Sequence, residues 1–365
     1  MRKKRSFSAP VMGTTRMKKL FLLLFTLLIL GSNGKIGAVV EQKAVTSRDN
    51  ANNNDVLTEN DQRLYRWKNA DDLWGYIDKT GQVVIPCQWK GAWEFCEGLA
   101  LVKDNESKYG YIDIMGQVVI PCQWKHAGAF YEGLATVENS DGKCGFIDKT
   151  GQVVIPFQWK DVSHFSEGLA WVKDNDGKYG FVDKTGKQVI SCQWKWAWIF
   201  SEGLACVEDN DGKYGFIDKT GQVVIPCQWY GAWSFCEGLA FVHDNDDKYG
   251  FIDKTGRIVI PCQWKNATAF CEGLTRVWDS KGKVGFINNI GKLVIPCEWN
   301  FADVFSEGLA AVENSEGKYG YIDKTGLLVI PCQWKYAYVF KDGLARVVDS
   351  DGNMHYIDNT AKIVK

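Results

Sequence analysis

Aromatic side chains are the residues of this sequence best suited to bind a ligand. Seven of them occupy positions that differ from copy to copy of a repeated segment, and they are Trp93, Trp196, Trp198, Trp233, Phe301, Tyr336 and Tyr338. Exposed rings of this kind anchor a protein partner or stack on the faces of sugars. If they are exposed they predict a binding surface, and if they are buried they extend the core. These seven are the candidate ligand-binding residues.

Eight further tryptophans stand at a single repeat position: Trp89, Trp124, Trp159, Trp194, Trp229, Trp264, Trp299 and Trp334. They could form a ladder that stacks on flat ligands. Because the residue is the same in every copy, a shared packing role is favoured. In that role each indole fills the space between units, and we expect its N–H to meet a backbone carbonyl.

Cysteines could bind metal, form disulfides or remain free. Of twelve, seven share one repeat position (Cys87, Cys122, Cys192, Cys227, Cys262, Cys297 and Cys332), and Cys96, Cys236 and Cys271 follow nine residues later. Phe157 takes the first position in one copy, so the site accepts an apolar side chain and indicates buried free thiols. Disulfides are the alternative, since an exported chain can form them. No Cys-x-x-Cys or Cys/His spacing suggests zinc, and we predict no metal site.

Acidic loops and histidines give little sign of catalysis. The loops that begin at Asp174, Asp209 and Asp349 start like a calcium loop but lack its later carboxylate, so turn formation is favoured. The four histidines, His126, His164, His243 and His355, fall at four different repeat positions. No nucleophile elbow, metalloprotease motif or phosphate loop is present, and we predict no catalytic residue and no cofactor.

The elements that position these residues come from one repeat of 35 residues. A glycine followed by an aromatic residue returns at Gly75, Gly110, Gly145, Gly180, Gly215, Gly250, Gly285 and Gly320, with His355 at the ninth place. No insertion or deletion breaks the period. Each unit therefore contacts its neighbours in the same way, and the array is the functional object.

Each unit predicts a three-stranded antiparallel meander. Residues 99–103, 108–113 and 117–120 are rich in Val, Ile, Tyr and Phe, and Asx- and Gly-containing loops such as residues 148–151 separate such segments. Pro121 and its counterparts are expected to end the third strand, because proline cannot donate to a continuing ladder. The stretch 123–130 fits a helical turn or a short fourth strand.

The meanders must stack on one another. Val84 and Ile85 point to opposite faces of the third strand, so both faces are apolar and both are expected to be covered. Stacking can give an open superhelix or a closed propeller. The array begins at residues 64–67 and ends at 362–365, which leaves no extra strand for a closing blade shared between the termini. We therefore predict an all-β open solenoid, with a closed β-propeller as the alternative.

The N-terminus predicts export. Lys18 and Lys19 precede an apolar run over residues 20–30, and small residues follow, so residues 1–34 are interpreted as a signal peptide. Cleavage after Ala38 and an uncleaved anchor are alternatives. Residues 35–62 are predicted to be a disordered polar spacer, and residues 63–365 to hold eight full repeats and a truncated ninth meander. We expect a periplasmic, cell-surface or secreted protein with no membrane span once the signal is removed.

Charge argues against nucleic acid as a partner. Residues 1–34 hold seven of the 43 basic residues and no acid, so their removal leaves 36 bases against 44 acids, a net charge of −8. A mildly acidic protein repels polyanions.

The motif Trp74-Gly75-Tyr76-Ile77-Asp78, followed by Phe95-Cys96-Glu97-Gly98, resembles the bacterial WG-repeat family. The likeness covers roughly residues 64–365, although tyrosine usually replaces the tryptophan of the motif. The resemblance implies a β-repeat scaffold, often exported, with no shared catalytic residues. We therefore expect a non-enzymatic exported scaffold that binds a protein or a cell surface. The alternative is a module that binds carbohydrate or another cell-envelope polymer through the variable aromatic residues, and an enzyme ranks third.

Overall fold

A computed structural model describes residues 64–78 and 80–364 of the chain. The regular elements of these residues are all β-strands, as predicted, and no helix among them could cross a membrane. The predicted signal peptide and polar spacer lie outside the described residues. The strands form nine antiparallel sheets, seven of four strands and two of three.

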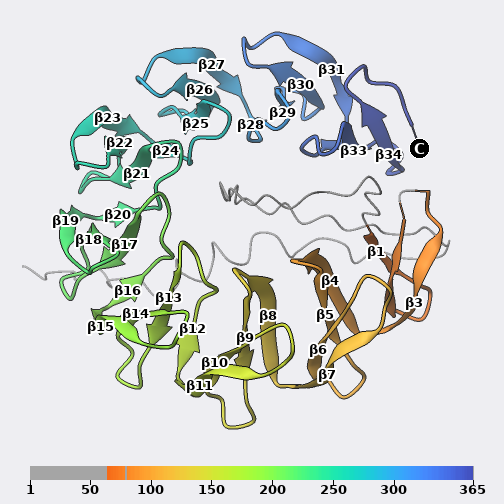
Figure 1. The fold of residues 1–365 in the computed structure, drawn as a ribbon. Helices are drawn as coiled ribbons and strands as arrows, with labels where there is room; N and C mark the ends of the chain where they lie inside the picture. The colour runs from red at the N-terminus through yellow and green to blue at the C-terminus, as the bar shows by residue number, and fades with distance from the viewer. Residues whose placement is uncertain (1–63, 79, 365) are drawn as a thin grey trace, which may run out of the picture. The chain divides into compact units, whose positions relative to one another are not determined.

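Within a complete sheet the strands follow chain order from the inner edge of a ring to its outer edge (Figure 1). The inner strands are β4 (Gly91–Cys96), β8 (His126–Tyr131), β12 (Asp161–Val162), β16 (Trp196–Ala197), β20 (Gly231–Ala232), β24 (Asn266–Ala267), β28 (Phe301–Ala302) and β32 (Tyr336–Ala337). The second strands are β1 (Tyr65–Lys68), β5 (Leu99–Lys103), β9 (Leu134–Glu138), β13 (Leu169–Lys173), β17 (Leu204–Glu208), β21 (Leu239–His243), β25 (Leu274–Trp278), β29 (Leu309–Glu313) and β33 (Leu344–Val348). The third strands are β2 (Trp74–Ile77), β6 (Tyr109–Ile112), β10 (Cys144–Ile147), β14 (Tyr179–Asp183), β18 (Tyr214–Asp218), β22 (Tyr249–Asp253), β26 (Val284–Asn288), β30 (Tyr319–Asp323) and β34 (Met354–Asp358). The outer strands are β3 (Val83–Trp89), β7 (Val118–Trp124), β11 (Val153–Trp159), β15 (Gln188–Trp194), β19 (Val223–Trp229), β23 (Ile258–Trp264), β27 (Leu293–Trp299) and β31 (Leu328–Trp334).

The stretch that the sequence left open is a strand. Residues 126–131 form β8, which pairs with β9 and so begins the next sheet. The first sheet, β1-β2-β3, consequently lacks an inner strand, and the last, β32-β33-β34, lacks an outer strand. The structural blade is therefore offset from the repeat that the glycines mark.

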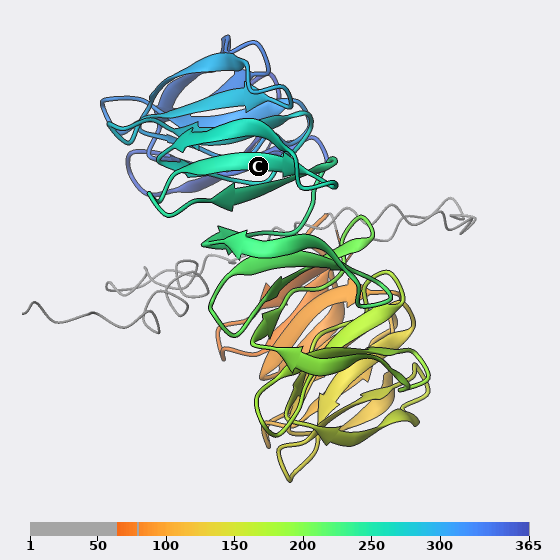
Figure 2. The ribbon, with the colours of Figure 1, turned by 90° about the vertical axis from the view of Figure 1, so that its left-hand side faces the viewer.

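The predicted open solenoid is wrong: the nine sheets form a closed β-propeller ring, which was the alternative (Figures 1 and 2). The first and last sheets meet. Burial raises the pKa of Tyr356 in β34, Arg346 partly offsets this, and the charge of Tyr65 in β1 adds a smaller increase, so the two phenols are electrostatic neighbours. The strand count led to the wrong prediction because a ring can close without a blade that the two termini share. Closure depends on the rotation between neighbouring sheets, which packing sets and the strand count does not reveal.

The third and outer strands meet at a β-bulge that explains the repeated glycine. Tyr109 pairs with Trp124 and Tyr111 with Ile120, with a register shift between the two pairs. A Cβ on Gly110 would lie 2.6 Å from the carbonyl oxygen of Ile120, closer than atoms can approach. His355 is tolerated at the ninth place because only an isolated bridge between Ile357 and Ile363 follows β34.

The prediction that proline ends the third strand is wrong. Strand β7 continues through Pro121 to Trp124. Proline is tolerated there because it lies at a bulge of an edge strand, where no ladder hydrogen bond from its nitrogen is required.

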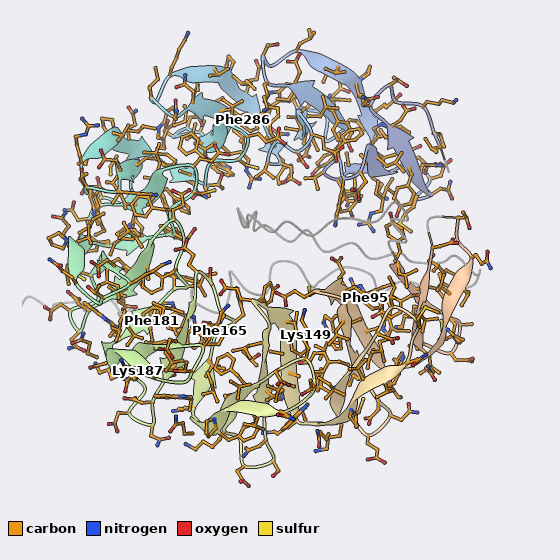
Figure 3. The ribbon with its side chains drawn as sticks, in the orientation of Figure 1. Phe95, Lys149, Phe165, Phe181, Lys187 and Phe286 are labelled. Carbon is orange, nitrogen blue, oxygen red and sulfur yellow. The ribbon has the colours of Figure 1, made fainter. Side chains whose placement is uncertain are left out.

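The core lies between the blades. One cluster joins Phe146 and Ile155 of one sheet to Phe165 and Val172 of the next, and the side chains of Figure 3 fill these interfaces around the ring. The expected cover on both faces fails at the outer strands, where Ile85 is 1% exposed but Val84 is 42% exposed. Blades of a ring diverge with distance from its centre, so a neighbour cannot cover the outer strand fully.

A polar clasp also joins neighbouring blades. Glu97 accepts a hydrogen bond of 3.0 Å from the N–H of Gly133 in the next blade, whose Lys149 approaches the same carboxylate at 3.2 Å (Figure 3 labels Lys149). The acceptor recurs at Glu132, Glu167, Glu202, Glu237, Glu272 and Glu307. Asn289 and Asn359 replace the lysine in two units. Repetition in almost every blade indicates a structural role for these acids.

Candidate functional site

The seven candidate aromatic residues all lie on the inner strands or directly after them. Trp93, Trp196, Phe301 and Tyr336 belong to β4, β16, β28 and β32, while Trp198, Trp233 and Tyr338 each follow an inner strand. Four rings are exposed: Trp198 by 39%, Phe301 by 37%, Tyr336 by 50% and Tyr338 by 41%. Trp93, Trp196 and Trp233 are half-buried. The inner edge of the propeller therefore carries four exposed aromatic side chains beside three that are half-buried.

One group of rings, the tryptophan surface, comprises Trp171, Tyr179, Trp196 and Trp198. The centroids of Trp171 and Tyr179 are 5.1 Å apart, and Tyr179 lies 5.0 Å from Trp196. Trp196 and Trp198 then meet edge to face at 6.0 Å. Tyr179 is fully buried and supports the others from below, so Trp198 is the most accessible ring of the candidate set on this surface.

A second group, the tyrosine surface, comprises Phe301, Tyr319, Tyr336 and Tyr338. Tyr319 lies between Phe301 and Tyr336, 6.0 Å from each ring centroid. The Arg346 guanidinium lies 3.9 Å from the ring of Tyr338 and supports it by a cation–π contact. Tyr336 and Tyr338 supply the exposed phenols of this group.

Register places both surfaces at the same end of the sheets. Trp196 pairs with Glu208, Phe301 with Glu313 and Tyr336 with Val348, which are equivalent positions in three sheets. Because the sheets repeat around one ring, equivalent positions lie on one of its faces. The two surfaces therefore share that face.

The row of rings is interrupted between the two surfaces. Asn266 and Thr268 occupy the equivalent positions in one blade. Trp233, in the blade before it, stacks face to face on Phe241 at 4.3 Å and is half-buried. Trp93 packs on Tyr109 at 5.6 Å and is also half-buried. These two candidates act mainly in packing.

The packing role of the eight repeated tryptophans is confirmed, but their predicted hydrogen bonds are wrong. Trp89, Trp194, Trp229 and Trp334 are buried within core clusters. Among the described residues, none of the eight indole N–H groups has a hydrogen-bond partner in the protein. Each indole therefore contributes to the blade through the packing of its ring and not through a hydrogen bond to the protein.

All twelve cysteines are free thiols, but the predicted burial is incomplete, because Cys206 is buried and the other eleven are half-buried. Burial, with a smaller contribution from the charge of Asp104, raises the pKa of Cys122 to about 11, so this thiol stays protonated at neutral pH. The second cysteine position has a role that the sequence did not reveal. Cys236 donates to the carbonyl of Phe270 in the next blade at 3.2 Å, and Ser201 makes the same bond at 2.8 Å in its own copy. The alternation of Ser and Cys was the available signal.

The acidic loops form turns, as predicted. In the turn after the third strand, Asp148 accepts hydrogen bonds from the N–H groups of Thr150 and Gln152. In the other loop, Asp174 accepts one from Lys178 at 2.8 Å. The side-chain hydrogen bond from Thr150 lowers the pKa of Asp148, and the backbone bonds lower it further.

One copy departs from the repeat pattern around a hollow. A hollow of about 160 Å³ lies where Gly128 and Cys144 replace larger side chains, and His126, Glu138 and Asp161 also line it. Within the described part of the chain, no group of three such side chains is placed to hold a metal ion. Burial, with smaller contributions from the charges of Asp161 and Glu138, raises the pKa of Cys144 to about 11, so its thiol is a poor nucleophile.

Comparison with known proteins identifies the family. A family model described as WG containing repeat matches residues 74–107, 109–144, 145–179, 179–214, 214–248, 249–277, 285–319 and 319–352. The chain belongs to the WG-repeat family. The matched segments are the 35-residue repeats described above, in which the outer strand crosses over the repeated glycine. No curated protein matches this WG-repeat chain.

Several solved structures resemble the WG-repeat chain at low identity. The computationally designed Ika8 protein is 15% identical, with 72% of this chain and 93% of that chain covered and a TM-score of 0.42. BamB from Moraxella catarrhalis is 12% identical, with coverages of 72% and 94% and a TM-score of 0.42. The WD40 beta propeller domain of Doa1 is 13% identical, with coverages of 70% and 88% and a TM-score of 0.30.

Proposed function

We propose that this WG-repeat propeller is a non-enzymatic binding scaffold that holds a carbohydrate polymer of the cell envelope on its tryptophan and tyrosine surfaces. One observation carries the proposal: exposed rings from several blades gather at one end of the inner strands. Trp198, Tyr336 and Tyr338 each expose about two fifths to one half of their surface. A partly exposed ring offers one face for stacking while its other face is packed.

The shape of the site favours a polymer over a small molecule. Small-molecule sites are usually enclosed pockets of 300–1,000 Å³. Two hollows in the described part of the ring are open and measure about 240 and 160 Å³, and none of the exposed rings of the two surfaces lines either of them. An extended chain of sugars can lie along an open row of rings without being enclosed.

A protein partner is the second candidate. Arg346 stacks on Tyr338, and Arg and Tyr are enriched where protein interfaces are most tightly bound. The excess of acids over bases argues against nucleic acid in either case. Export is part of the proposal and rests on the apolar run at residues 20–30.

Retention on insoluble polysaccharide tests the proposal. The purified protein is incubated with chitin, cellulose and peptidoglycan, and the bound fraction is compared with that of a Trp198→Ala/Tyr336→Ala/Tyr338→Ala variant. We expect retention on at least one polymer and at least a tenfold weaker affinity in the variant, since each lost stacking contact costs about 1 kcal/mol.

Tyr230→Ala is the matched control. Tyr230 is 51% exposed but belongs to neither surface, so its loss is expected to leave retention unchanged. The carbohydrate assignment is withdrawn if no polymer retains the protein, or if the triple variant is retained as well as the parent.

A further inference from the structure

The geometry points to two independent carbohydrate sites on one ring, the tryptophan surface and the tyrosine surface, that a single long polymer bridges. This inference rests on the proposed function and adds the number and arrangement of the sites. Their separation, their common face and their different composition carry it.

The two surfaces are separate in the ring. The tryptophan surface is built from the sheets of β13 and β17, and the tyrosine surface from those of β29 and β33. Strands β17 and β33 lie on opposite sides of the central opening (Figure 1). Between the surfaces, Asn266 and Thr268 supply no ring, and Trp233 is covered by Phe241. A short oligosaccharide on one surface therefore cannot touch the other.

A common face makes bridging possible. The equivalent pairs Trp196 with Glu208 and Tyr336 with Val348 put both sets of rings at the same end of their sheets. A polymer that leaves one surface can reach the other without passing around the rim. Its second contact is then intramolecular, at an effective concentration that depends on the length of chain between the sites.

The two sites also differ in strength. Trp198 offers an indole, the largest aromatic face, whereas Tyr336 and Tyr338 offer phenols. We expect the tryptophan surface to bind a short oligosaccharide more tightly. A long polymer then binds more tightly than a short oligosaccharide only if both surfaces are intact, whichever of the two binds the oligosaccharide more tightly.

Calorimetry with two probes tests the inference. The trimer of β-1,4-linked N-acetylglucosamine is the short probe, and water-soluble glycol chitin is the long one. The parent protein should bind two trimers, and the long polymer about 100-fold more tightly per protein than the trimer. Trp198→Ala and Tyr336→Ala/Tyr338→Ala should each bind one trimer and lose most of the gain for the long polymer.

The outcomes separate this inference from the proposed function. If the parent binds one trimer, or if one variant loses all binding while the other keeps the full affinity for the polymer, two bridged sites are ruled out but carbohydrate binding stands. If neither probe binds, the two-site inference fails, and retention on cellulose or peptidoglycan decides separately whether carbohydrate binding stands. Far-ultraviolet circular dichroism of each variant confirms that the ring is intact.

Discussion

At the scale of single residues, steric exclusion explains the most regular feature of this chain. The outer strand crosses directly over Gly110, and its counterparts are crossed in the same way in seven other sheets. A side chain there would collide with backbone atoms, which cannot move aside as a flexible side chain can. The repeated glycine is therefore a packing requirement and carries no chemistry.

We predict that Gly110→Ala destabilises the fold by about 1–3 kcal/mol, the usual cost of forcing an extra methyl into a packed region. The added carbon would lie 2.6 Å from the Ile120 oxygen and 2.7 Å from the Cys122 nitrogen. Urea unfolding measures the loss. His355→Ala, at the same repeat position but without an outer strand over it, should change stability less; equal losses would contradict the steric explanation.

The turn aspartates predict that the stability of the fold depends on pH. Hydrogen bonds from Thr150, Thr185 and Thr220 lower the pKa of Asp148, Asp183 and Asp218 in the folded state. A carboxyl with a lowered folded pKa contributes stability above its unfolded pKa of about 3.9, and that contribution disappears as the pH falls through the folded value.

Replacing these three aspartates by asparagine should therefore flatten the decline of stability below about pH 4. Asn288 already performs the turn role in one copy, where it accepts hydrogen bonds from Ile290 and Lys292. Urea midpoints at pH 7 and pH 3 measure the effect. An unchanged difference between the two midpoints would show that other carboxylates control acid unfolding.

At the scale of the element, the glutamate contacts that form the polar clasp attach a hairpin loop of one blade to the next blade. Glu202 accepts a hydrogen bond from Gly238 at 3.0 Å and pairs with Lys254 at 3.1 Å. The backbone N–H depends on that carboxylate, whereas Lys254 is nearly half exposed and can be hydrated. The two contacts should therefore contribute different amounts to the free energy of unfolding.

We expect Glu202→Ala to destabilise the ring by about 1–2 kcal/mol, because the amide of Gly238 loses its acceptor. Lys254→Ala should cost no more than about 1 kcal/mol, as exposed ion pairs contribute little. Glu202→Gln keeps an acceptor oxygen and should fall between them. Thermal unfolding ranks the three variants, and the reverse order would assign the joint to the ion pair.

At the scale of the whole molecule, closure places the binding residues. The propeller brings eight inner strands around one opening (Figure 1). Aromatic side chains from distant repeats thereby gather on one face. In an open array the same residues would be spread along a line, and the first and last sheets would be far apart.

Closure predicts a cross-link between the ends of the array. Tyr65 and Tyr356 come from the first and last sheets, and the charge of Tyr65 contributes to the raised pKa of Tyr356. In a variant with the twelve native cysteines replaced by serine, Tyr65→Cys/Tyr356→Cys should form an intramolecular link with a short bismaleimide. Mass spectrometry detects it. Tyr65→Cys/Tyr230→Cys, which joins non-adjacent sheets, is the control, and equal yields would argue against a closed ring.

The sequence by itself determined the local structure. The period, the strands and the turn aspartates follow from residue type and spacing, because these depend on short-range sterics and hydrogen bonds. Even the extra inner strand was among the possibilities that the stretch 123–130 allowed. The seven aromatic candidates could be named for the same reason, as the positions where copies differ.

Only the tertiary structure decided closure, exposure and grouping. The angle between blades arises from the packing of residues such as Phe146 and Phe165 across an interface, and a small change repeated nine times separates a ring from a superhelix. Exposure of Val84 depends on how far blades diverge, and that of Trp198 and Tyr336 on which neighbours face them. These are long-range relations, which the order of residues within one repeat does not contain.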